Sequence, residues 1–376
     1  MNKQLLTDKI VKIETFIVDL PTIRGHQLSM TTMTVQSSVI VKVFTESGIM
    51  GLGEAATIGG LSYGPESPEG MKLAIDQYIA PLIIGQSISS IKALRQRISQ
   101  NIRGNYFAKN AIETALFDIQ GKILNVPVST LLGGKVTDKL SVLWVLASGD
   151  TEKDIIEAKE MIAAGRHKDF KLKIGRRPVR EDVAHVIAIK EALGDESMVT
   201  VDVNQAWTEA EAILGMQLLQ DAGIDLVEQP LAQQEIDAQA RLSHRFNIPI
   251  LADESVGLAY EGFNIAKIAG ARAFALKIAK SGGMLGVLEL ADVAKAAGIG
   301  LYGGTMLEGS IATSAAIQAF STLPELEWGT ELFSPLLLKD DIVIEPLRYF
   351  EYGVEVSNKP GLGLELDEDK VNHYKR

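Results

Sequence analysis

Apolar and polar positions follow two different rhythms along this chain. Near the start, β-type patterns over residues 10–20 and 37–55 predict strands, and Glu46–Gly48 predicts a hairpin turn. Farther along, apolar residues recur at three- and four-residue intervals, a spacing typical of amphipathic helices. The helices predicted in this part span 71–83, 87–102 and 108–125.

From about Leu140 onward, short apolar runs alternate with helical patterns. Four clear helical patterns, 152–165, 180–194, 209–223 and 284–298, each end at a glycine, which is a common helix stop signal. Strands that recur about every 25 residues with helices between them are typical of a parallel barrel rather than a sandwich. The eight predicted strands are 140–148, 170–175, 198–204, 224–230, 248–255, 273–279, 298–305 and 328–333.

These rhythms divide the chain into three predicted parts. Residues 1–134 form an α+β domain, and residues 135–334 form the barrel. Residues 335–376 return to short β-like pieces and turns, which we expect to pack back on the first domain.

The second predicted barrel strand, FKLKIG at 170–175, alternates apolar residues with two lysines. The two-residue period of a strand places Lys171 and Lys173 on one face. One interpretation is an edge strand whose lysines face water and discourage aggregation. The other is that both lysines point into a cavity and take part in chemistry there.

Three carboxylates lie at the predicted carboxyl ends of three successive strands. Asp202, Glu228 and Asp253 are 26 and 25 residues apart, so one strand–helix repeat returns each to the same rim, where barrel enzymes place catalytic side chains. Taken singly, each would more often cap a helix or face solvent. Three converging carboxylates repel one another unless a cation lies between them. The all-oxygen ligand set favours one divalent ion, Mg²⁺ or Mn²⁺, over zinc or copper.

Lysines flank this acidic centre on two sides. Lys171 and Lys173 come from the second strand and Lys277 from the sixth, on the opposite side of the barrel. Taken alone, a lysine is more often a surface residue. Beside another lysine and a metal, we expect its pKa to be lowered toward the range useful for proton transfer. Asn204 and Glu331 lie at further strand ends, and His26, in a loop-like stretch, is a candidate lid residue.

Composition and charge narrow the classes of function. The chain has 376 residues, 46% apolar and 23% charged, as in an ordinary globular protein. Its net charge of −11 argues against nucleic acid or an anionic membrane as a partner. Its lack of cysteine excludes disulfides, zinc–thiolate sites and cysteine nucleophiles. The N-terminal stretch mixes charges with apolar residues, unlike a signal peptide, and no apolar run approaches the roughly 20 residues of a membrane helix, so we expect a cytoplasmic protein.

The order of these residues resembles the enolase superfamily and, within it, the muconate lactonizing enzymes. That group is marked by K-x-K on the second barrel strand, Asp, Glu and Asp ligands on the third to fifth, and a lysine on the sixth. The resemblance extends from the first domain through the tail. It is carried by the stretches IVDLPTIR, EAATIGGLSYGPESPEG, LASGDT, FKLKIG, VDVNQAW, IGLYGGTMLEGSI and WGTELFSPLLL.

The resemblance implies a modified TIM barrel, (β/α)7β, whose α+β first domain and C-terminal tail cap the barrel and supply a substrate loop. It implies reversible, metal-dependent conversion of cis,cis-muconate to muconolactone through an enolate intermediate, in catechol degradation by the β-ketoadipate pathway. The substrate would be a small dicarboxylate, and the protein a homo-oligomer, octameric in the family.

The resemblance also assigns roles to residues. Lys173 would transfer the proton, Lys171 would polarise the substrate carboxylate and tune Lys173, and Lys277 would be an electrostatic partner opposite. Glu331 would donate a proton or stabilise the enolate. Asn204 would support the metal ligands. Substrate-binding positions would be Ile58, Tyr63, Asn204 and Phe333.

Two other activities use the same frame. Chloromuconate cycloisomerases share all of it, but TIGGLSY and TELFSP with Phe333 look like the enzymes for the unchlorinated substrate, whereas Ser334 and the IATS after Ser310 depart slightly from that pattern. A dipeptide epimerase or N-acylamino acid racemase would be a different reaction on this frame; epimerases carry Asp-x-Asp on the eighth strand, where this chain has Gly329, Thr330 and Glu331. That difference counts against an epimerase. A non-catalytic metal-binding barrel would be expected to lack one or more of the lysines, and all are present.

Overall fold

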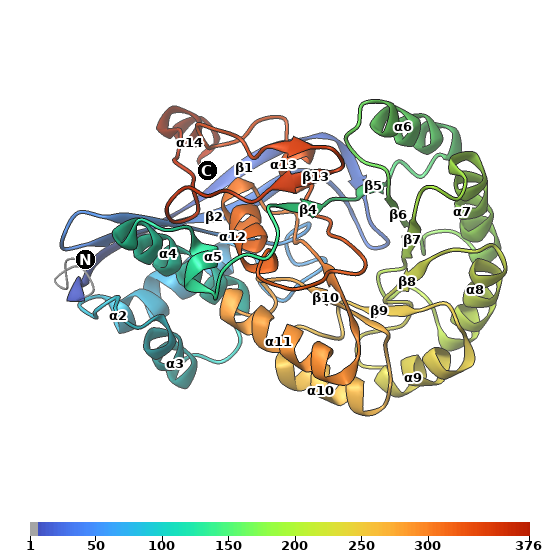
Figure 1. Cartoon of the computed structure of the whole chain (residues 1–376), viewed down its shortest axis with the longest axis horizontal. Coiled ribbons are helices and arrows are strands. Elements are labelled where there is room, and N and C mark those ends of the chain that lie inside the picture. Colours follow the sequence, from blue (N-terminus) through green and yellow to red (C-terminus); the bar gives the residue numbers. More distant parts are fainter. Residues whose placement is uncertain (1–6) are drawn as a thin grey trace.

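A computed structural model describes residues 7–376, so residues 1–6 of the predicted first domain lie outside it (Figure 1). The chain begins with an antiparallel sheet of order β1-β2-β3, made of β1 (Ile10–Gln27), β2 (Thr32–Thr45) and β3 (Met50–Ala56). The predicted turn at Glu46–Gly48 is confirmed, because residues 46–48 lie between β2 and β3 and Thr45 N donates to Ile49 O at 3.0 Å.

Helices cover this sheet. The predicted helix 71–83 is built from α1 (Pro68–Ala74), a π-helical turn η2 (Ile75–Ile79) and α2 (Ala80–Ile83). The next two predictions correspond to α3 (Ile91–Asn101) and α4 (Tyr106–Leu124). Most of α4 is buried, because one side packs on β3 and another meets α11 and α12 of the barrel. The short helix α5 (Val128–Leu131) follows.

Seven parallel strands form the barrel sheet, in the order β11-β10-β9-β8-β7-β6-β5. Helices alternate with the strands along the chain, and α6 to α11 form an arc around them (Figure 1). The strands are β5 (Trp144–Leu146), β6 (Phe170–Lys173), β7 (Val199–Asp202), β8 (Leu226–Glu228), β9 (Ile250–Ala252), β10 (Ala273–Leu276) and β11 (Gly300–Gly303). The helices are α6 (Thr151–Ala163), α7 (Val179–Leu193), α8 (Glu209–Asp221), α9 (Ile236–Arg245), α10 (Ala259–Lys267), α11 (Met284–Ala297) and α12 (Ser310–Phe320).

The predicted eighth strand, 328–333, is not an extended strand. Within it, Thr330 alone makes β-bridges, in parallel with Gly303 at the end of β11 and with Val142 just before β5. Leu143 N donates to Thr330 O at 2.8 Å, and Glu331 N donates to Gly303 O at 2.8 Å. A single residue therefore joins the two edges of the sheet, and the predicted α/β barrel is confirmed with a minimal eighth member.

The last part of the chain returns toward the start. Helix α13 (Ser334–Leu337) follows the barrel, and β12 (Tyr349–Phe350) and β13 (Gly353–Glu355) form a small sheet with β4 (Lys139–Ser141). After α14 (Glu368–Tyr374), Lys375 bridges to Val18 of β1. The domain limits 1–134, 135–334 and 335–376 stay a prediction. No helix within the described part of the chain is long and apolar enough to cross a bilayer.

Candidate active site

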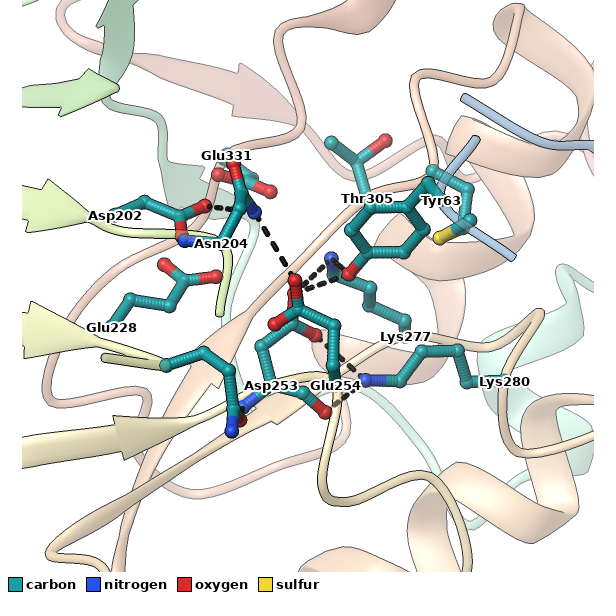
Figure 2. A network of polar contacts seen from close by, with 12 residues as sticks. Tyr63, Asp202, Asn204, Glu228, Asp253, Glu254, Lys277, Lys280, Thr305 and Glu331 are labelled. Carbon is teal, nitrogen blue, oxygen red and sulfur yellow. Dashed lines mark hydrogen bonds and ion pairs between the residues drawn. The ribbon is translucent and has the colours of Figure 1, made fainter. Parts of the chain in front are cut away.

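The strand register aligns the predicted site residues in a row. Lys173 of β6 is the register partner of Asp202 in β7, and Asp202 is the partner of Glu228 in β8. Asp253 follows β9 by one residue, and Lys277 follows β10 by one. Because all these strands run parallel, the side chains meet at the carboxyl rim of the barrel, as the sequence predicts. Figure 2 shows Asp202, Glu228, Asp253 and Lys277 there.

Lys171 lies inside the barrel between two carboxylates. Its ammonium nitrogen is 2.5 Å from Glu228 Oε2 and donates to Glu331 Oε2 at 2.6 Å, and its side chain is 0% exposed. Tyr302 of β11 donates a hydrogen bond to the same oxygen of Glu331 at 2.7 Å, and its ring faces Lys171. The edge-strand interpretation of FKLKIG is therefore wrong, because this lysine does not face water.

Lys173 and Lys277 each pair with one predicted metal ligand. Lys173 Nζ donates to Asp202 Oδ2 at 2.5 Å, and Lys277 Nζ donates to Asp253 Oδ2 at 2.7 Å. Lys280, which was not predicted to belong to the site, donates to Asp253 Oδ1 at 2.7 Å. The stem of Lys277 runs close to the backbone after β11, where a Cβ on residue 304 would lie 2.8 Å from its carbons, so Gly304 leaves room for it.

These pairings set the charge of each group. Burial alone would lower the pKa of Lys173, but Asp202 and Glu331 outweigh it and raise that pKa. The lowering expected beside a bound metal stays a prediction. Burial would raise the pKa of Glu331, yet Lys171, Lys277 and Lys173 lower it to about 2. Burial and the neighbouring Asp202 raise the pKa of Glu228 well above its usual range. Ionising Glu228 is thus costly in the absence of further positive charge.

Buried acceptor atoms surround the three predicted metal ligands. Across residues 7–376, no three Asp, Glu or His side chains are arranged closely enough to hold a metal as they stand, because each predicted ligand pairs with a lysine. Yet Oε1 of Glu228, Oδ1 of Asn204 and Oε2 of Glu254 are buried without a hydrogen-bond partner, while Oε2 of Glu228 is ion-paired with Lys171. Buried acceptors without donors are costly unless a cation satisfies them. The residues therefore fit a hard divalent ion.

Two of the predicted substrate-binding residues join this cluster. Tyr63 OH donates to Asp253 Oδ2 at 2.5 Å and accepts from Lys277 Nζ at 2.9 Å (Figure 2). Asn204 has a left-handed backbone, with φ 44°, and its Nδ2 donates to Asp202 Oδ2 at 3.1 Å.

The other two predicted substrate-binding residues lie in apolar surroundings. Phe333 is fully buried, with its ring 5.0 Å from that of Trp144 and 6.4 Å from that of His26. Ile58 follows β3 and is buried in the hydrophobic core. Contact of these two side chains with the substrate stays a prediction.

Several residues of the site were not predicted from the sequence. Glu254 directly follows the predicted ligand Asp253, and Lys280 lies three residues after Lys277. This closeness in the sequence was the available signal. Tyr302 lies in GLYGGT, on a strand whose inward face could have been read by its two-residue period. His26 is not in a loop but in β1, 1% exposed, with neither ring nitrogen bonded. Burial and the neighbouring Lys173 lower the pKa of His26 to about 3, so the imidazole is neutral.

A parallel barrel with acidic side chains and lysines on its carboxyl rim, joined to an α+β part, defines an enzyme of the enolase class. Residues 154–370 match the family described as enolase C-terminal domain-like. Residues 12–133 match the mandelate racemase / muconate lactonizing enzyme N-terminal domain. The chain belongs to the mandelate racemase / muconate lactonizing enzyme family, and membership implies dependence on a divalent metal ion without specifying which.

The chain is similar to named relatives over nearly its full length. It is 54% identical to "Muconate cycloisomerase 1" of Acinetobacter baylyi, covering 97% of this chain and 99% of the relative. A crystal structure of muconate lactonizing enzyme from Pseudomonas fluorescens complexed with muconolactone has a TM-score of 0.98 and 54% identity, covering 98% and 100% of the two chains. A "Chloromuconate cycloisomerase" of Delftia acidovorans is 42% identical, covering 98% of this chain and 99% of the relative.

Proposed function

We propose that this chain is a muconate cycloisomerase, an intramolecular lyase that interconverts cis,cis-muconate and muconolactone in catechol degradation by the β-ketoadipate pathway. The observation that carries the proposal is the pair Lys171 and Lys173 on β6, buried among carboxylates on the barrel rim. The similarity to relatives of that activity over almost the whole chain supports it.

Lys173 carries the proton. In the lactonizing direction its ammonium would deliver a proton to the carbon beside the substrate carboxylate. In the reverse direction the neutral amine takes that proton back. Glu331 has a pKa of about 2 and is ionised, so it balances the charge of Lys171 rather than donating a proton.

Lys171 and Lys277 supply fixed positive charge on two sides of the site. Both are almost fully buried, at 0% and 3% exposure, so their fields act on the substrate with little screening by water. The phenol of Tyr63, held by Lys277 and Asp253, closes the site from the capping side. We further propose that Ile58, Phe333 and Asn204 line the substrate.

Asp202, Glu228 and Asp253 would hold one divalent ion, Mn²⁺ or Mg²⁺, and the buried Oε1 of Glu228, which has no hydrogen-bond partner, supports this assignment. When bound, such an ion supplies positive charge that stabilises negative charge developing on the substrate carboxylate. Asn204 would orient Asp202 through its backbone N–H, 2.8 Å from Oδ1, and through its Nδ2. A cytoplasmic location and a homo-oligomeric state stay predictions.

The main alternative is a chloromuconate cycloisomerase on the same frame. The identity of 54% to the muconate enzyme against 42% to the chloromuconate enzyme favours the unchlorinated substrate. The test is ultraviolet measurement of cis,cis-muconate loss, run beside 2- and 3-chloromuconate with Mn²⁺ and with Mg²⁺. We expect cis,cis-muconate to give the highest kcat/KM. Comparable or faster turnover of the chlorinated substrates would shift the assignment to the alternative.

A further inference from the structure

Hydrogen bonds to Asp182 hold the loop between β6 and α7, residues 174–178, in one conformation. Asp182 of α7 is buried and accepts from Gly175 N at 2.7 Å and from Arg177 N at 3.3 Å. Gly175 has φ +102°, and a Cβ there would lie 2.6 Å from that of Ala206. The loop therefore has little freedom, and the side chains that it projects start from a fixed backbone.

Two consecutive arginines on this loop differ in whether a carboxylate balances their positive charge. Arg177 Nε donates to Asp182 Oδ1 at 3.2 Å, so its charge is balanced by that carboxylate. Arg176 is exposed, and its Nε donates to the backbone carbonyl of Ser29 at 3.3 Å. No carboxylate of residues 7–376 forms an ion pair with Arg176. Its positive charge is therefore uncompensated at close range.

Arg176 lines a cavity whose wall also includes Lys173, the proposed proton-transfer lysine. The cavity has a volume of about 210 Å³. It is lined by residues 27–29 at and just after the end of β1, by Ala147 and Gly149 after β5, and by Lys173, Ile174, Arg176, Arg177 and Asp182. Its one lining carboxylate is Asp182, which is already engaged by Arg177 and the loop backbone. The cavity wall is thus cationic in a chain whose net charge is −11.

We propose that this cavity is the entry route for the dianionic substrate and that Arg176 draws the dicarboxylate into it. The inference rests on the proposed function, because it takes a small dicarboxylate as the substrate. A chain of net charge −11 repels a dianion at long range, and a cationic channel with low-dielectric walls reverses that field locally and raises the rate of productive encounter. Arg176 acts on capture of the substrate, and Lys173 acts on the reaction.

The test compares Arg176→Gln, Arg176→Lys and Arg180→Gln in the metal-loaded enzyme. Arg180 is an exposed residue of α7 that does not line the cavity, so its substitution removes an equal charge elsewhere. We expect Arg176→Gln to lower kcat/KM for cis,cis-muconate by roughly three- to tenfold at low ionic strength, with kcat unchanged. The deficit should shrink between roughly 0.01 M and 0.3 M salt, as screening shortens the reach of the charge.

Arg176→Lys and Arg180→Gln test whether the effect comes from a positive charge at position 176 in particular. Arg176→Lys keeps the charge without the guanidinium geometry and should retain the kcat/KM and salt dependence of the wild type, as should Arg180→Gln. If Arg176→Gln matches the wild type at low salt, the proposal is wrong. It is equally wrong if Arg176→Gln and Arg176→Lys lose the same kcat/KM at every salt concentration. The hydrogen bond to Ser29 would then matter and not the charge.

A binding measurement separates this inference from the proposed function. Adipate is a saturated dicarboxylate of the same length that cannot cyclise, and its affinity for the Mn²⁺-loaded protein can be measured by calorimetry. We expect Arg176→Gln, and not Arg176→Lys, to weaken adipate binding severalfold at low salt. If the wild type does not turn over cis,cis-muconate, the proposed function fails, and the adipate comparison still decides the role of Arg176.

Discussion

Lys173 and Asp202 lie side by side at the ends of adjacent strands, with the ammonium nitrogen 2.5 Å from a carboxylate oxygen. The parallel register of β6 and β7 makes them direct neighbours. A proposed proton-transfer group and a proposed metal ligand thus neutralise each other in the metal-free chain. The same pairing explains why the pKa of Lys173 is raised although burial alone would lower it.

Lys173→Ala should abolish turnover while leaving metal binding intact. Lys173 supplies the proton but contributes no ligand atom, and its removal frees the oxygen of Asp202 to which it donates. Turnover is measured by the loss of muconate absorbance and bound Mn²⁺ by paramagnetic resonance, with Lys168→Ala, an exposed lysine, as control. Lactonization that persisted in Lys173→Ala would remove this residue from the mechanism.

Glu228→Gln should weaken metal binding and, at the same time, stabilise the metal-free protein. Glu228 is buried, and although Lys171 lies 2.5 Å from its Oε2, burial and the neighbouring Asp202 raise its pKa well above the usual range, so its charge is unfavourable there. A neutral amide relieves this cost, by on the order of 1 kcal/mol at pH 7. Loss of an outer partner of a metal ligand costs roughly 10–100-fold in affinity, so loss of a ligand should cost at least as much.

The two effects of Glu228→Gln are measured separately. Urea unfolding in a chelator gives the metal-free stability, and the rise in Tm on adding Mn²⁺ gives the relative affinity. Wild-type protein should lose turnover in the chelator and regain it with Mn²⁺. A Glu228→Gln protein that is less stable without metal, or gains as much from Mn²⁺ as the wild type, would contradict the assigned role.

Lys171→Met should destabilise the metal-free fold strongly. The substitution keeps an unbranched apolar stem but removes the ammonium, which leaves Glu228 and Glu331 facing each other across its place. Removing one partner of a buried ion pair typically costs about 3–5 kcal/mol. Urea unfolding measures the loss, and the double variant Lys171→Met/Glu331→Gln should recover part of it, because one of the two stranded charges is gone. Equal stabilities of the single and double variants would argue against this coupling.

Local periodicity was enough to predict most of the site. The two-residue period of FKLKIG placed both lysines on one face, and the repeat length placed three carboxylates on one rim. What periodicity does not encode is pairing across distance. Lys171 and Glu331 are 160 residues apart, and only the folded chain shows that they share a hydrogen bond.

The eighth strand shows a second limit of the same kind. WGTELF has the composition of a strand, yet closing the barrel requires bridges at Thr330 alone. The residues after it turn at once into α13, which begins at Ser334. Strand length is set by the partners available on either side, and the sequence of the segment itself does not contain that information.

The last prediction concerns Glu54, which joins the capping sheet to the barrel. Its carboxylate accepts from Gly309 N at 2.7 Å and from Ala312 N at 3.0 Å, at the start of α12, and the residue is 1% exposed. Burial raises its pKa to about 7, against the effect of both backbone bonds. Between pH 4.5 and 7 the folded state therefore binds a proton that the unfolded state has released. Stability contributed by this group is present below about pH 4.5 and is lost as the pH rises through 7.

Glu54→Gln should remove that pH dependence. We expect the stability of the wild type minus that of Glu54→Gln to fall by up to about 3 kcal/mol between roughly pH 5 and pH 8, measured by urea unfolding. The difference is the relevant quantity, because burial also raises the pKa of Glu113 and of Glu254 to about 7, and those groups titrate in both proteins. A difference that stays flat or rises with pH would mean that the two backbone N–H groups at the start of α12 hold Glu54 ionised in the fold.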